Sequence, residues 1–140
     1  GVVGFVCATG IVFFGALATL SEGDFYLGLE DKLLGQIRLA LTGQHYLNDG
    51  GSITLISGIV AHEPIAQGVN ATTVNAGLEG FVRAAACELP RGIRINLISP
   101  TVLTESAAAN DGPRFCQRPR RQRGSGLPPQ RRRHPERTDL

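Results

Sequence analysis

The feature that most constrains the fold of this chain is an alternation of three short apolar runs with two long amphipathic segments. The apolar runs, rich in β-branched residues, cover residues 1–8, 52–57 and 93–98. Residues 24–47 and 72–89 between them carry apolar side chains at helical spacing. Strands that are joined by helical crossovers pair in parallel. The pattern therefore predicts an α/β fold with the order β-α-β-α-β and a layered parallel sheet.

Local signals place the predicted helices. Ser21 and Asp24 are candidate N-caps of the first helix, and residues 48–51 (Asn-Asp-Gly-Gly) form a stop signal after it. Residues 59–70 contain Pro64 and Gly68, which predicts a loop. The apolar stripe of the first helix consists of Phe25, Leu29, Leu33, Leu34, Ile37 and Leu41, and that of the second of Val74, Leu78, Phe81, Val82, Ala85 and Leu89.

The strand ends predict where a ligand would bind. In open parallel sheets, ligands bind beyond the carboxyl ends of the strands. The loops at that edge are Ala8-Thr9-Gly10, Ser57-Gly58-Ile59 and Pro100-Thr101-Val102. Three strands form only a small sheet with two open edges, so we expect these elements to be part of a larger fold.

Charge divides the chain at about residue 110. Residues 1–110 hold nine acidic and five basic side chains, whereas residues 111–140 hold nine arginines and three acidic residues. The basic segment has three interpretations: an arm that binds nucleic acid, a solvated disordered tail, or an out-of-frame reading of a GC-rich gene. Arginine without lysine, mixed with Pro, Gly and Gln, favours the last, so a nucleic-acid partner is not expected. We expect residues 1–110 to form the domain.

The cysteines and the apolar N-terminal stretch exclude several classes of protein. Cys7, Cys87 and Cys116 are scattered, and no histidine lies at ligand spacing from them, so we expect neither a metal site nor disulfides, and a cytoplasmic location. Cys7 and Cys87 lie in apolar runs, which predicts buried, inert thiols.

Residues 1–21 are uncharged but contain four glycines and have no basic flank. This favours a buried strand and loop over a transmembrane helix, and no membrane partner is expected.

Two segments resemble the short-chain dehydrogenase/reductase family. They are Gly50-Gly51-Ser52-Ile53-Thr54-Leu55-Ile56-Ser57-Gly58 and the segment VNAGLEGFVRAAACELPRGIRINLISP at residues 74–100. The resemblance covers roughly residues 5–110. It implies the C-terminal part of a Rossmann-type, three-layer α/β/α domain that binds NAD or NADP. The implied reaction is hydride transfer between the cofactor and an alcohol or carbonyl substrate.

The positions where this family carries its catalytic residues are all substituted here. The resemblance places the tyrosine, which serves as general acid and base, at Ala71 and its lysine partner at Asn75. The serine position falls on Gly58, next to Ser57, and the helix asparagine position falls on Lys32. Ala71 cannot transfer a proton, so the tyrosine-dependent mechanism is not expected. If a proton relay has been rebuilt, Lys32, Ser57 and Asn75 are the polar residues placed to share it.

The cofactor landmarks of the family are retained only in part. The resemblance places cofactor contacts at Ala8, Thr9 and Gly10 after the first strand and at Pro100, Thr101 and Val102 after the third. Nothing in the sequence resembles the Gly-x-x-x-Gly-x-Gly phosphate loop. The sequence begins at the family's fourth strand, so we expect a chain truncated at its N-terminus, without the adenosine and pyrophosphate half of the site.

Two polar features near the expected site have competing interpretations. Lys32 is either a relocated catalytic cation or a lysine on a solvated helix edge beside Glu30 and Asp31, and the second interpretation is favoured. His62 and Glu63 are either an acid and base pair or a polar surface loop, and the surface loop is favoured.

The sequence therefore supports two hypotheses about function. The first is an NAD(P)-dependent oxidoreductase of this family, incomplete or catalytically degenerate, that acts on a small alcohol or carbonyl compound. The alternative is a non-catalytic module that associates with a related subunit. The resemblance implies a homo-oligomer formed through the helices at residues 24–47 and 72–89.

Overall fold

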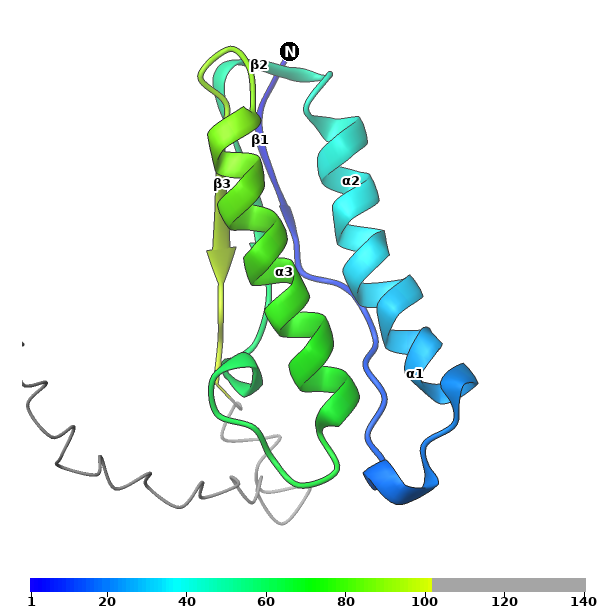
Figure 1. Ribbon diagram of the computed structural model, residues 1–140. Coiled ribbons are helices and arrows are strands. Elements are labelled where there is room, and N and C mark those ends of the chain that lie inside the picture. Colours follow the sequence, from blue (N-terminus) through cyan, green and yellow to red (C-terminus); the bar gives the residue numbers. More distant parts are fainter. Residues whose placement is uncertain (102–140) are drawn as a thin grey trace, which may run out of the picture.

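The computed structural model describes residues 1–101, which contain a three-stranded parallel sheet (Figure 1). The strands are β1 (Val2–Cys7), β2 (Leu47–Ile56) and β3 (Arg94–Ile98), and β2 lies in the middle. Their register pairs Ile53 with Phe5 on one side and with Ile95 on the other. The predicted α/β class with parallel strands is therefore confirmed.

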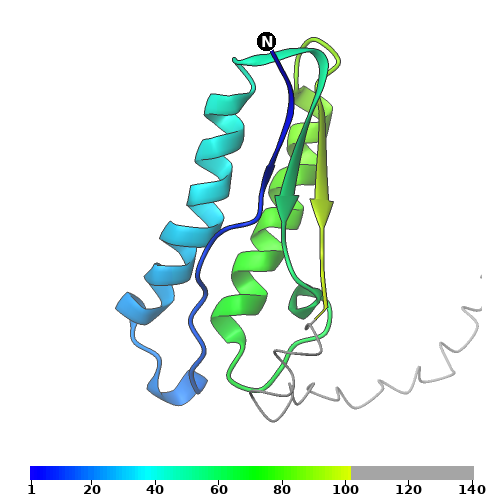
Figure 2. The same ribbon diagram turned by 180° about the vertical axis from the view of Figure 1, so that it is seen from behind.

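Helices connect the strands and cover one face of the sheet. The first connection contains α1 (Glu22–Gly28), a π-helical segment η2 (Leu29–Leu34) and α2 (Gly35–Gly43), which follow one another without a break. The second contains α3 (Val69–Glu88). Both helical connections lie on the same side of the strands, as the front and back views show (Figures 1 and 2). Residues 1–101 thus contain two layers, and the third layer that we expected is not among them.

The core lies between the sheet and these helices. Side chains of β2 alternate, so that Ile53 and Leu55 are fully buried while Thr54 and Ile56 face the other side. Helix α3 contributes the buried Val74, Leu78 and Val82, as its apolar stripe predicts. Short 3₁₀ turns lie in the connections, η1 at Leu17–Thr19 and η3 at Ile59–Ala61, the latter within the predicted loop.

The first helical segment ends earlier than the sequence predicts. It begins after Ser21, whose hydroxyl accepts from the backbone N–H of Asp24 at 3.1 Å while the Asp24 carboxylate accepts from the Ser21 N–H at 3.0 Å. It ends at Gly43, and residues 48–51, which we expected as its stop signal, belong to β2 instead. Arg91 explains this, because its guanidinium donates to the carbonyl oxygens of Leu47 at 2.8 Å and Gln44 at 2.6 Å and holds the early part of β2.

The predicted apolar stripe of the first helix is wrong in its second half. Leu41 is 52% exposed, whereas Gln36 and Ala40 are buried. The cause is η2, because a π-helical turn inserts an extra residue and rotates everything after it around the helix axis. Spacing that fits an uninterrupted α-helix therefore assigns the wrong face to α2.

Cysteine burial is also predicted correctly only in part. Cys7 at the end of β1 is buried, but Cys87 is exposed. Cys87 lies in the last turn of α3, where its thiol contacts the Arg83 carbonyl oxygen at 3.6 Å.

Within residues 1–101, no helix has the length and apolar character that a membrane crossing requires. The predictions for Val102, Cys116 and residues 111–140 lie outside the described part of the chain.

Candidate functional site

The carboxyl ends of the three strands meet at one edge, where backbone hydrogen bonds join the loops that follow them. The Ser57 N–H donates to the Ile98 carbonyl oxygen at 2.8 Å, and the Ile59 N–H donates to that of Pro100 at 3.0 Å. The loop after β2 is therefore fixed to the loop that contains Pro100 and Thr101. Ala8, Thr9 and Gly10 follow β1 at the same edge.

Lys32 reaches this edge from η2. Its ammonium donates to the Ser57 carbonyl oxygen at 3.2 Å, and its side chain is half-buried. The backbone of Gly10, at φ +125°, packs so closely against the Lys32 stem that a Cβ there would lie 2.6 Å from the Lys32 Cβ. Burial lowers the pKa of the Lys32 ammonium. The favoured interpretation of Lys32 as a solvated helix-edge lysine is therefore wrong.

The two acidic neighbours of Lys32 are engaged elsewhere. Glu30 forms an ion pair with Arg38 at 2.7 Å, and that guanidinium lowers the pKa of the Glu30 carboxyl. Asp31 accepts a hydrogen bond from the Ile11 backbone N–H. Lys32 forms no ion pair with a described carboxylate, so its ammonium faces the strand ends without a counter-charge from residues 1–101.

Gln36, one turn after Lys32, is a site residue that sequence reasoning missed. It is 1% exposed, its amide N–H donates to the Ile56 carbonyl oxygen at 2.9 Å, and its amide oxygen accepts from the Ile56 N–H at 2.9 Å. The same amide group lies 3.4 Å from the Thr9 carbonyl oxygen. Gln36 therefore joins the ends of β1 and β2. The only signal in the sequence is its spacing of four residues from Lys32.

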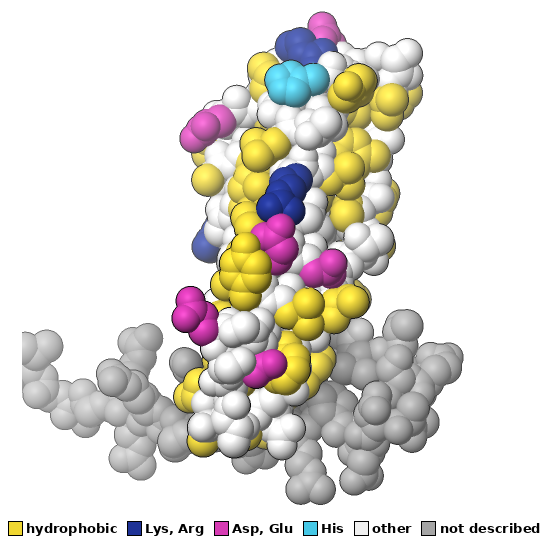
Figure 3. Space-filling view, turned by 90° about the vertical axis from the view of Figure 1, so that its right-hand side faces the viewer, with side chains coloured by type: hydrophobic (Ala, Val, Ile, Leu, Met, Phe, Trp, Pro, Cys, Tyr) yellow, Lys and Arg dark blue, Asp and Glu magenta, His cyan; other side chains and the backbone are white. Residues whose placement is uncertain are grey.

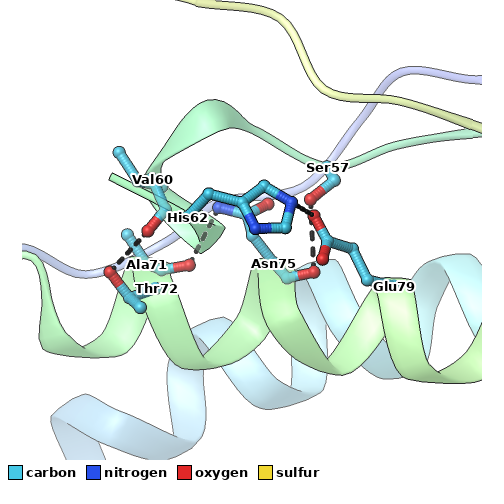
Figure 4. A network of polar contacts seen from close by, with 7 residues as sticks. All are labelled: Ser57, Val60, His62, Ala71, Thr72, Asn75 and Glu79. Atoms are coloured by element: carbon cyan, nitrogen blue, oxygen red, sulfur yellow. Dashed lines mark hydrogen bonds and ion pairs between the residues drawn. The ribbon is translucent and has the colours of Figure 1, made fainter. Parts of the chain in front are cut away.

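The first two turns of α3 supply the other side of the site (Figure 4). Ala71 and Asn75 are one turn apart and buried, and the Asn75 amide donates to the Ala71 carbonyl oxygen at 2.8 Å. The Ser57 hydroxyl donates to the backbone carbonyl oxygen of Asn75 at 3.2 Å. Gly58 lies against the Asn75 side chain, since a Cβ at Gly58 would be 3.4 Å from Asn75 Nδ2. Among residues 1–101, the buried Asn75 Oδ1 atom has no hydrogen-bond partner.

His62 has a different carboxylate partner from the one that we considered. Its Nε2 lies 2.8 Å from Glu79 of α3, one turn after Asn75, rather than beside Glu63 (Figure 4). The His62 side chain is 66% exposed and that of Glu79 17%. The Thr72 hydroxyl donates to the Val60 carbonyl oxygen at 2.9 Å, which attaches the η3 turn before His62 to α3.

Asn70 is the second residue that sequence reasoning missed. It is fully buried, donates to the Phe25 carbonyl oxygen at 2.7 Å and accepts from the Phe13 backbone N–H at 2.9 Å. It therefore fixes both α1 and the loop after β1 to the start of α3. Asn70 lies in residues 59–70, which we expected to be a loop, whereas α3 begins at Val69, so no sequence signal pointed to it.

The structure thus brings Lys32, Ser57, Gly58, Ala71 and Asn75 around the end of β2. A half-buried cation, a hydroxyl and an orphaned amide oxygen can bind a polar, uncharged or anionic group and exchange a proton with it. Ala71 brings no titratable group. A parallel α/β sheet with a polar site at its carboxyl edge defines the class of Rossmann-type proteins.

Comparison with known proteins narrows this class. A family model described as Enoyl-(Acyl carrier protein) reductase matches residues 1–127. The chain is 34% identical over 106 residues to Carbonyl reductase family member 4 of Danio rerio, with 74% of this chain and 45% of that protein covered. The chain belongs to the short-chain dehydrogenase/reductase family, as its sequence motifs imply.

Solved structures agree with this assignment. The protein lin1944 from Listeria innocua is 44% identical with a TM-score of 0.74, over 76% of this chain and 53% of that one. A small-chain dehydrogenase in complex with NADPH is 29% identical with a TM-score of 0.69, over 77% and 51% of the two chains. The chain therefore spans about half the length of these relatives.

Proposed function

We propose that the protein acts as an NAD(P)-dependent oxidoreductase on a small alcohol or carbonyl compound, and that the described residues form the nicotinamide and substrate side of its site. The observation that carries this proposal is the half-buried Lys32 ammonium, directed at the end of β2 beside Ser57 and Asn75. The family assignment supports it, and so does the NADPH found in one of the relatives.

The residues at this edge fit the nicotinamide half of the cofactor. The orphaned Asn75 Oδ1 is an acceptor that a carboxamide N–H or a ribose hydroxyl would satisfy, and Lys32 is a donor for a ribose or substrate oxygen. When bound, the nicotinamide gives or takes a hydride. The phosphate loop of the family is absent from the 140 residues of the sequence. We therefore expect weak binding by this chain alone.

In this proposal the catalytic residues are the polar ones that remain at the family positions. Lys32 holds the proton that the substrate oxygen gains or loses, and Ser57 and Asn75 position that oxygen. Gly58 and Ala71, at the family's serine and tyrosine positions, supply no side-chain group to the chemistry. Thr9, Gly10, Pro100 and Thr101 border the cofactor, with Ala8 behind them; Val102 belongs to the same predicted set but lies outside the described residues.

Calorimetry tests the proposal. We expect the full chain to bind NADPH or NADH with a measurable heat, and to bind ADP-ribose, which lacks the nicotinamide, at least roughly fivefold more weakly, a difference of about 1 kcal/mol. The variant Lys32→Met should lose that preference. Equal binding of the dinucleotide and of ADP-ribose, or no binding of either, would contradict the proposal.

A second candidate function is a non-catalytic module that associates with a copy of itself or with a related subunit through the helices at residues 24–47 and 72–89. Exposed leucines on the first helical segment favour it, because Leu27, Leu39 and Leu41 are each more than 40% exposed. Figure 3 shows apolar side chains interleaved with charged ones on this side of the molecule. Sedimentation velocity tests this candidate, because it requires a complex. The division at residue 110 and the cytoplasmic location remain predictions.

A further inference from the structure

Lys32 is the single lysine in the 140-residue sequence, and its surroundings differ from those of an ordinary surface lysine. Its Nζ donates to a backbone carbonyl oxygen, that of Ser57 at 3.2 Å. The stem is enclosed by the Gly10 backbone. The edge that Lys32 faces contains no tyrosine at the family position, which Ala71 occupies.

We propose that Lys32 binds carbonyl compounds covalently, by condensation of its amine with an aldehyde or ketone to give a reversible imine. The Nζ lone pair attacks the carbonyl carbon to form a carbinolamine, the C–O bond then breaks, and the oxygen leaves as water with protons from the amine and solvent. No oxidant or reductant is consumed. The proposal rests on the proposed function only in its placement of a carbonyl substrate at this edge.

Three further observations favour the neutral amine that this step needs. Burial lowers the pKa of the Lys32 ammonium, so more of the amine is unprotonated near neutral pH than in an exposed lysine. On its own helical segment Glu30 is paired with Arg38, and Asp31 is bonded to the Ile11 N–H. The loop before α3 and α3 itself carry the charged groups His62, Glu63, Glu79, Arg83 and Glu88. His62 and Glu79 pair with each other at 2.8 Å, and within residues 1–101 none of the five forms an ion pair with Lys32.

The Asn75 side chain gives the condensation a polar neighbour. Its Oδ1 is buried and has no hydrogen-bond partner among residues 1–101. The Asn75 side chain lies against Gly58, the residue after the Ser57 whose backbone carbonyl oxygen accepts from Lys32. The hydroxyl of a carbinolamine is a donor that can satisfy such an acceptor. The site therefore contains both the nucleophile and an acceptor for the first adduct.

Reductive trapping tests the proposal without any cofactor. The full chain is incubated with butanal and cyanoborohydride at pH 7, and the N-butyl adducts are located and timed by peptide mass spectrometry. The matched control is the double variant Lys32→Arg/Arg38→Lys, which moves the single lysine onto an exposed position of the same helical segment. We expect Lys32 to be butylated about tenfold faster than the lysine at position 38, because burial lowers the pKa of Lys32 and leaves more of its amine unprotonated at pH 7.

Equal rates for the two lysines, or trapping at the Gly1 amine alone, would overturn the proposal. If the double variant does not fold, the wild-type chain unfolded in urea provides the reference rate for the same lysine. The outcome is independent of the proposed function, because calorimetry with NADPH reports on the cofactor whether or not Lys32 forms an imine. NADPH binding without fast trapping would leave the oxidoreductase proposal intact and remove this one.

Discussion

Lys32 and Gln36 lie one helical turn apart and give the carboxyl edge of the sheet its polar character. Lys32 donates to Ser57, and Gln36 pairs with both backbone groups of Ile56. Each side chain is withdrawn from water, so each depends on the partner that it meets there. Both contacts should therefore have a measurable effect on the free energy of unfolding.

The charge of Lys32 makes stability depend on pH. Its pKa in the folded chain lies below its ordinary value of 10.5, so the unfolded chain binds more protons in the window between the two values. The free energy of unfolding should therefore rise as the pH increases through the folded pKa toward 10.5. Urea unfolding at pH 7 and at pH 10 measures this rise, which should be smaller in Lys32→Met. An equal rise in the variant would show that other groups cause it.

Replacement of Gln36 should destabilise the protein strongly. Gln36→Leu leaves the Ile56 N–H and carbonyl oxygen buried without partners, at a cost of about 2–3 kcal/mol in the free energy of unfolding. Gln44→Ala is the matched control, because Gln44 makes one exposed hydrogen bond to Leu41. Its loss should cost about 0.5 kcal/mol or less. Similar losses in urea unfolding for both variants would contradict the role of Gln36.

The sequence identified the substituted family positions but not the residues that support them. Ala71, Asn75, Gly58 and Lys32 follow from flanking motifs, which fix their place in the chain. Gln36 could not be found, because a polar residue in a helix is normally expected on the solvent side. Asn70 could not be found, because the segment 59–70 was expected to be a loop rather than the start of α3. Their burial depends on backbone groups from other elements, which local spacing does not reveal.

At the scale of elements, the existence and order of strands and helices were predictable, but the face of the first helical segment was not. The π-helical η2 turn rotates α2, which exposes Leu41 and buries Ala40. No residue in Leu29–Leu34 predicts a π-helical turn. The same turn carries Lys32, so the irregularity lies at the candidate site, where such turns frequently occur.

Two helical glycines should respond in opposite ways to alanine. A Cβ at Gly28 would collide with the Asn70 side chain that joins α1 to the loop after β1, so Gly28→Ala should destabilise the protein by about 1–3 kcal/mol. A Cβ at Gly80 in α3 meets no atom within 4 Å, so Gly80→Ala should stabilise it by about 1 kcal/mol through helix propensity alone. Thermal unfolding measures both, and a shared sign would refute the assigned packing.

At the scale of the whole molecule, the described residues form a sheet with helices on one face only. The other face presents Val6 and Ile98, which are 66% and 51% exposed. The chain spans about half the length of its relatives, which agrees with a sheet that has apolar surface on its second face. The larger fold that the sequence predicts would cover this surface.

The helical side should mediate self-association if the second candidate function holds. Leu39→Glu/Leu41→Glu places two charges among the exposed leucines and should weaken a dimer by at least about tenfold in Kd, whereas Gln44→Glu, near the end of the same segment, should leave it unchanged. Sedimentation velocity over a range of concentrations measures this. A wild-type chain that stays monomeric at high concentration would contradict the candidate.

The proposed site depends on the environment of Lys32, and one measurement reports on that environment directly. Because the sequence contains one lysine, a chain made with ¹⁵N,¹³C-lysine gives a single side-chain amine signal by NMR. We expect this signal to titrate below 10.5, because burial lowers the pKa of Lys32, and to shift when NADPH is added at constant pH. A titration at 10.5, with no response to NADPH, would contradict both the burial of Lys32 and the proposed site.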